Sequence, residues 1–208
     1  MTARGLSRER LVAIALDYVA ANGLDALTVR RLAVAADVTP GALYKHFRDQ
    51  RDIRRAMADA VYATIDLSDV DTAAPSVAQV ITCCERMRGA MLHYRDGGRI
   101  VAGSYSPFAA TAALSATLRA LLQAVVLPGV DAGDIAYVLR NYTVGFVIEE
   151  QAYLALAASG EWDDLVQTLP RSAGTGTSRG SDAVAILTDD RDTRFRAGLE
   201  AILTGVVG

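Results

Sequence analysis

The chain has 208 residues, 51% of them hydrophobic and 6% aromatic, a composition that excludes a disordered or fibrous protein. The net charge of −3 conceals an uneven distribution, because residues 1–55 carry ten basic and six acidic side chains while the rest carry eleven basic and eighteen acidic ones. Only the N-terminal part has the positive charge needed to approach DNA phosphates, unless the difference is chance scatter.

The first predicted helix spans residues 7–22, where apolar residues recur at helical spacing, and Gly23 is placed to end it. Thr28 is the expected N-cap of a second helix, over residues 29–36. Thr39 followed by a proline predicts a third helix that runs to about residue 46. Asp49 is the expected cap of a fourth helix, which reaches about residue 66.

The remaining chain is predicted to be helical as well, with a short acidic junction at residues 67–75. A short turn is expected around residues 162–169, before a flexible loop at 170–182 that is rich in Gly, Ser and Thr. The other helices are expected over residues 76–94, 97–102, 107–126, 131–159 and 192–207. The alanine- and leucine-rich composition agrees with an all-α protein.

No segment approaches the roughly 20 apolar residues of a membrane span, and the start lacks the apolar core of a secretory signal. We therefore expect a soluble, cytoplasmic protein with no membrane partner. Cys83 and Cys84 are adjacent and cannot form an unstrained bridge, so two buried thiols are expected, with a redox-sensing role as the alternative.

Residues 28–47, TVRRLAVAADVTPGALYKHF, fit a helix-turn-helix, in which one helix supports a second that enters the DNA major groove. Ala33 is small enough to let the third helix approach, and Val38 and Leu43 would fill the wedge between the helices. Tyr44, followed by a lysine and a histidine, supplies the donors that phosphate contacts require. The alternative for Tyr44 and His46 is simple packing of this small domain.

This stretch resembles the tetracycline-repressor family, in an alanine-rich first helix that ends in Asn-Gly, then LTVRRLA, then VTPGALYKHF. The resemblance implies a three-helix DNA-binding domain (1–49), a connecting helix and linker (50–75), and a ligand-binding and dimerisation domain (76–208). Gln50 departs from the family, whose members often place a phosphate-binding lysine there, and Arg51 is the expected substitute. The DNA-binding residues implied are Thr28, Arg30, Thr39, Pro40, Gly41, Ala42, Tyr44, Lys45, His46 and Arg51.

Two later stretches, YRDGGRIVAG (94–103) and YTVGFVIEEQA (142–152), are similar to the helices that frame the drug pocket of the tetracycline repressors. The family's drug chelates magnesium, and the histidine that binds this metal falls at Val101. One carboxylate, Glu149, is too few for a metal site, so no metal and no cofactor are expected.

The expected ligand is a small apolar or aromatic molecule, because the side chains at the corresponding positions are mostly apolar. The alternative for each of them is a place in the core, and for His93 a hydrogen bond at a helix end. The expected ligand-binding residues are Met87, His93, Val101, Tyr105, Phe108, Leu118, Leu122, Asn141, Tyr142, Phe146 and Glu149.

The resemblance also implies a homodimer in which the helices at 131–159 and 192–207 pair with their counterparts, so that two recognition helices match a palindromic operator. The last helix agrees with this, because it carries an apolar stripe that would otherwise be exposed. The stripe consists of Phe195, Leu199, Ile202, Leu203 and Val206. The predicted function is a repressor that binds its double-stranded DNA operator as a homodimer and is released by a small-molecule effector.

Three alternatives accompany this prediction. A helical di-iron enzyme is disfavoured because neither histidine completes a Glu-x-x-His motif. GTGTSRG (174–180) lacks the lysine of a phosphate loop and follows no predicted strand. We therefore expect no catalytic residues. An activator or a protein-binding member with the same fold remains the third alternative.

Overall fold

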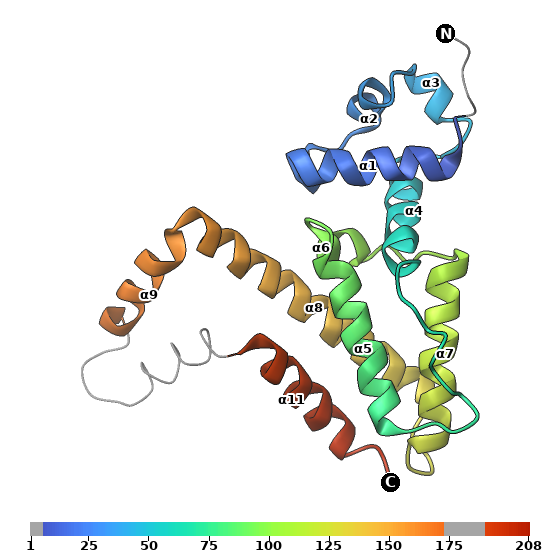
Figure 1. Ribbon diagram of the computed structural model, residues 1–208, viewed down its shortest axis with the longest axis vertical. Coiled ribbons are helices and arrows are strands. Elements are labelled where there is room, and N and C mark those ends of the chain that lie inside the picture. The colour runs from blue at the N-terminus through green and yellow to red at the C-terminus, as the bar shows by residue number, and fades with distance from the viewer. Residues whose placement is uncertain (1–5, 173–189) are drawn as a thin grey trace.

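The computed structural model describes residues 6–172 and 190–208, and within these ranges it is all-helical, as predicted. A small head at one end of the molecule is joined by helix α4 to a larger helical body (Figure 1). An isolated antiparallel bridge between Val126 and Val207 is the one extended pairing among the described residues.

The head consists of α1 (Arg8–Asn22), η1 (Leu24–Ala26), α2 (Val29–Ala35) and α3 (Pro40–Leu43). The predicted caps are confirmed: the hydroxyl of Thr28 accepts a hydrogen bond from the backbone N–H of residue 31, and that of Thr39 from residue 42. Asp37 adopts φ 53° in the turn between α2 and α3, a conformation that Asp tolerates better than most residues. The turn thus places α3 against α2 at the outer end of the head.

Helix α4 (Gln50–Tyr62) leaves the head and runs into the body, where it contacts α6 and α7 (Figure 1). The body contains α5 (Val77–Leu92), α6 (Gly97–Val101), α7 (Ala109–Val125), α8 (Ala132–Ser159), α9 (Glu161–Ser172) and α11 (Arg191–Thr204). Helices α8 and α9 extend to one side of the body, away from α4.

Two hydrophobic clusters divide the interior. The first joins the head to the upper body and includes Leu32, Leu43 and Met57, together with Met91 and Ile100 from α5 and α6. The second lies deeper in the body between α5, α7, α8 and α11. Since α4 is part of the first cluster from its start to its end, the head is packed onto the body by apolar contact.

Several predicted elements differ from the structure. Helix α3 ends at Leu43, before residue 46, and α4 ends at Tyr62, before residue 66. The short turn expected at 162–169 is a full helix, α9. Most of the flexible loop predicted at 170–182 lies outside the described residues.

The interpretation of the α11 stripe was wrong for three of its five residues, whereas Ile202 and Val206 are half-buried. Phe195, Leu199 and Leu203 are fully buried within the chain itself, against α5 and α8, so they do not need a second protomer to cover them. The stripe indicated burial, but a sequence stripe does not say which surface covers it.

Candidate DNA-binding head and ligand pocket

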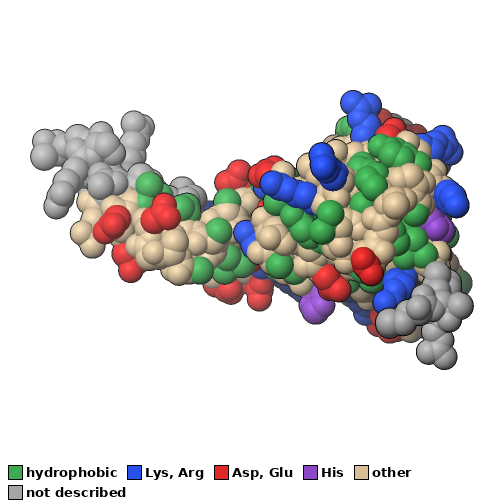
Figure 2. Space-filling model, turned by 90° about the horizontal axis from the view of Figure 1, so that it is seen from above, with side chains coloured by type: hydrophobic (Ala, Val, Ile, Leu, Met, Phe, Trp, Pro, Cys, Tyr) green, Lys and Arg blue, Asp and Glu red, His purple; other side chains and the backbone are tan. Residues whose placement is uncertain are grey.

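All ten predicted DNA-binding residues lie at the surface, nine on the head and Arg51 at the start of α4. Ala42 and His46 are half-buried and the other eight are exposed. Tyr44 is 58% exposed, which disfavours the interpretation that it only packs the domain. Leu43 is buried, as predicted, and so is Phe47. Figure 2 views the molecule from the head end and shows Lys and Arg side chains projecting around the head, with hydrophobic side chains between them. This surface offers cations and hydroxyl donors to phosphate groups.

Internal contacts hold the exposed residues in place. The Arg8 guanidinium forms an ion pair with Asp52 at 2.9 Å, donates to the backbone carbonyl of His46 and lies over the ring of Phe47. The side-chain amide of Gln50 donates to the carbonyl of Leu27 at 2.8 Å, just before α2. Gln50 therefore has a structural contact at the position where the family resemblance led us to expect a lysine, and Arg51 next to it is exposed.

Two arginines of α4 bind the body. Arg54 donates to the carbonyls of Arg99, Ile100 and Ala102, at the C-terminal end of α6, and Arg55 donates to that of Ser104 at 3.2 Å. Carbonyls at the end of a helix carry partial negative charge and lack partners within the helix, so guanidinium groups suit them. The two side chains therefore fasten α4 to α6.

A second set of polar contacts joins the far end of the head to α6. The Asp96 carboxylate accepts from the backbone N–H of Leu24 at 2.8 Å, and Arg99 pairs with both Asp25 and Asp96. Arg95 donates to the last carbonyls of α1. Helix α6 thus contacts both α4 and the end of α1, and any shift of α6 acts on both.

The body holds a pocket of about 230 Å³ between α4, α5, α7 and α8. Tyr62, the last residue of α4, lines it, so the connecting helix forms part of the pocket wall. The lining residues are Tyr62, Met87, Leu114, Ser115, Leu118, Arg119, Gly133, Ala136, Tyr137 and Arg140.

Of the eleven predicted ligand-binding residues, Met87 and Leu118 line this pocket. Val101 is fully buried, and its carbonyl lies 3.5 Å from the Arg140 guanidinium of the lining. Leu122 is buried in the second cluster, and Phe108 lines a different groove, between head and body. The structure places the remaining six elsewhere, with His93, Tyr105, Asn141 and Glu149 exposed and Tyr142 and Phe146 packed against α11.

Sequence reasoning missed most of the lining, although a signal for it exists. Residues 133, 136, 137 and 140 form one stripe at helical spacing on α8, and residues 114, 115, 118 and 119 form another on α7. Facing stripes on two neighbouring helices enclose the space between them.

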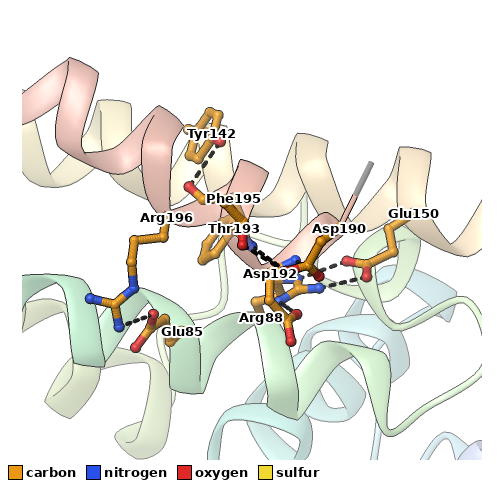
Figure 3. Close-up of polar contacts among 9 residues, drawn as sticks. All are labelled: Glu85, Arg88, Tyr142, Glu150, Asp190, Asp192, Thr193, Phe195 and Arg196. Atoms are coloured by element: carbon orange, nitrogen blue, oxygen red, sulfur yellow. Dashed lines mark hydrogen bonds and ion pairs between the residues drawn. The ribbon is translucent and has the colours of Figure 1, made fainter. Parts of the chain in front are cut away.

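Tyr142 and Phe146 belong to an aromatic cluster with Phe195, whose ring stacks on that of Tyr142 with an interplanar angle of 11°. Next to it, Arg88 forms a buried ion pair with Glu150 at 2.6 Å and a second pair with Asp192 at the start of α11 (Figure 3). The buried carboxylate of α8 is therefore Glu150, whereas Glu149 faces solvent. This network fastens α5, α8 and α11 together.

Both cysteines are buried free thiols. Burial raises the pKa of Cys84 to about 12 and also raises that of Cys83, which disfavours the reactive thiolate. In the described ranges, no group of three or more His, Cys, Asp or Glu side chains is arranged to hold a metal ion. No helix in these ranges is long and apolar enough to cross a membrane.

Comparisons with known proteins cover nearly the whole chain. Residues 11–57 match the family described as bacterial regulatory proteins of the tetR family, and residues 76–207 match the tetracyclin repressor-like C-terminal domain. The tetracycline repressor protein class C of Escherichia coli is 34% identical over 97% of this chain and 90% of its own length.

Solved structures agree with these matches. A possible TetR family transcriptional regulator from Streptomyces coelicolor A3(2) superposes with a TM-score of 0.81 at 33% identity, covering 96% of this chain and 98% of its own. The TetR family protein ActR from Streptomyces coelicolor, in complex with (S)-DNPA, gives a TM-score of 0.78 at 25% identity, covering 97% of both chains. With a DNA-binding helix-turn-helix head on a helical ligand-binding domain, the chain belongs to the tetracycline-repressor family of transcription regulators.

Proposed function

We propose that the protein is a homodimeric repressor that binds a palindromic operator and is released by a small molecule in the pocket of the body. One observation carries the proposal: α4 begins beside the exposed helix-turn-helix and ends at Tyr62 in the pocket wall. A ligand that contacts Tyr62 acts directly on the helix that carries the DNA-binding head. Such a ligand releases the protein from DNA only if it binds the conformation that does not bind DNA more tightly than the conformation that does.

The residues proposed to contact DNA are the ten predicted ones, nine on the head and Arg51 at the start of α4. Tyr44 and Lys45 follow α3 directly and are both exposed, which suits them to phosphate groups. Gly41 and Ala42 have few hydrogen-bonding groups, so sequence preference here depends on thymine methyl groups and on DNA shape.

The homodimer is proposed to form through the exposed faces of α8 and α11. Gly145 on α8 and Ala197 and Ala201 on α11 are exposed, and such small residues allow helices of a second protomer to approach closely. Val138, 44% exposed on α8, adds apolar surface to the same helix pair. Two protomers related by a two-fold axis would present two heads to the two half-sites of a palindrome.

The function is tested by fluorescence anisotropy with a labelled duplex from the region upstream of the protein's own gene and a scrambled duplex of equal length. The wild type is expected to prefer the upstream duplex and to bind it more weakly as the salt concentration rises. Lys45→Ala is expected to weaken binding and to lower the salt slope by about one for each phosphate contact that is lost.

Arg86→Ala is the matched control, since Arg86 lies on the body, paired with Asp69, far along the chain from the head. It should leave operator affinity unchanged. Equal affinity of the wild type for both duplexes at every salt concentration would contradict the proposal.

A further inference from the structure

The ligand pocket is apolar, yet its charged groups are all of one sign. Met87, Leu114 and Leu118 supply apolar wall. Among the described residues, the charged side chains of the lining are Arg119 and Arg140, and none of the lining residues is Asp or Glu. An anion bound here would meet uncompensated positive charge in surroundings that screen charge poorly.

Arg140 is half-buried, and no carboxylate of the described residues pairs with it. Its guanidinium lies 3.4 Å from the side-chain oxygen of Asn141 and 3.5 Å from the carbonyl of Val101, both long for hydrogen bonds. By contrast, the arginines at positions 8, 88 and 99 each pair with a carboxylate. In the part of the chain that the structure describes, neither Arg140 nor Arg119 forms an ion pair with a carboxylate.

The pocket also holds an unpaired donor. Tyr62 is only 4% exposed, and among the described residues no acceptor takes a hydrogen bond from its hydroxyl, while the Arg140 guanidinium lies near it as a donor. Burial raises the pKa of this hydroxyl to about 12, and the nearby Arg140 guanidinium acts in the opposite direction. The hydroxyl therefore stays protonated at neutral pH and is free to donate. A buried polar group without a partner is costly, and a ligand that accepts its hydrogen bond removes that cost.

We propose that this pocket selects a compact aromatic carboxylate, whose carboxylate binds the Arg140 guanidinium and accepts a hydrogen bond from Tyr62 while its ring lies against Met87 and Leu118. Arg119, exposed on α7, adds positive charge to the same lining. The inference rests on the proposed function for its biological meaning, but the binding site itself is defined by the residues above.

The test is isothermal titration calorimetry of the full-length protein, without DNA, with two matched pairs of probes: 1-naphthoate with 1-naphthamide, and benzoate with benzamide. Each carboxylate is expected to bind at least tenfold more tightly than its uncharged amide. Arg140→Met is expected to weaken carboxylate binding roughly 10- to 100-fold and to abolish the preference for charge. Arg140→Lys should retain part of that preference.

Tyr62→Phe removes only the hydroxyl, and it is expected to weaken the carboxylates severalfold with little effect on protein stability. Arg86→Met, which removes an arginine outside the pocket, is the control and should change the affinity neither for the carboxylates nor for the amides. The inference is overturned if neither carboxylate binds more tightly than its amide, or if the preference survives in Arg140→Met.

Operator binding is measured on the same samples to separate the two proposals. A charge preference that depends on Arg140, in a protein that does not bind its operator, would support this inference and contradict the proposed function. Operator binding that responds to the amides as well as to the acids would support the proposed function and contradict this inference.

Discussion

The guanidinium of Arg54, on the helix that leaves the DNA-binding head, lies 3.2 Å from the carbonyl oxygen of Ala102, the residue that caps α6. The same guanidinium donates to two further carbonyls at this helix end. The contact joins α4 to a short helix that also touches α8, which lines the pocket. It is therefore a polar link between the helix that carries the head and the ligand-binding body.

Arg54→Met is expected to lower the free energy of unfolding by about 1–3 kcal/mol, since it removes charged hydrogen bonds from half-buried carbonyls. Urea unfolding measures this change, and hydrogen exchange at α6 should become faster. Arg51→Met, one turn earlier and exposed, should leave stability unchanged and weaken DNA binding instead. Equal stability of the two variants would show that the link contributes little.

The stability of the head should depend on pH through Asp52. Burial acts to raise the pKa of this carboxyl, but hydrogen bonds from the Arg8 guanidinium and the Arg48 N–H outweigh burial and lower it. The unfolded chain has an Asp pKa of about 3.9. Because the pKa in the folded protein is lower, the charged carboxylate stabilises the fold fully at pH values above the unfolded pKa, and this stabilisation is lost as the pH falls through the folded pKa.

Asp52→Asn should therefore be less stable than the wild type at pH 7, and the difference should shrink below about pH 4. Chemical unfolding at a series of pH values measures it. A difference that stays constant over this range would mean that the Asp52 charge does not contribute.

The thiols of Cys83 and Cys84 should resist modification in the folded protein. With a pKa of about 12 for Cys84, only roughly one thiol in ten thousand is ionised at pH 8. A colorimetric thiol reagent is expected to react slowly with the native protein and rapidly with both cysteines in denaturant. Val34→Cys, at a position that is 76% exposed, provides a fast-reacting control in the same fold. Rapid native labelling without that substitution would revive a redox role.

Gly198 is required by the packing of α11 on α8, because an added Cβ would overlap the hydroxyl of Tyr142. Gly198→Ala is expected to destabilise the protein by about 1–3 kcal/mol in thermal or urea unfolding. Adding Tyr142→Phe to the Gly198→Ala variant removes the overlapping hydroxyl and should restore part of the lost stability. Gly89→Ala, on α5 with open space around it, should be neutral or stabilising by up to about 1 kcal/mol. Similar effects of the two alanines would contradict this packing.

The sequence predicted the head far better than the pocket, for a physical reason. Caps such as Thr28 and Thr39 act on backbone groups within three residues, so a local pattern suffices to place them. The pocket depends on which faces of distant helices meet. Arg140, which lines it, and Tyr142, which was expected to, are two residues apart and so point to roughly opposite sides of α8. Tertiary packing decides which of these two sides of α8 faces the pocket.

The central claim is that the ligand-free protein binds two half-sites as a dimer. Hydroxyl-radical footprinting of the upstream DNA tests it most directly. The wild type is expected to protect two regions related by two-fold symmetry, with centres about 34–36 Å, or a multiple of this distance, apart along the helix. Tyr44→Ala should lose both regions together. Protection of a single region without symmetry, or none at saturating protein, would contradict the account.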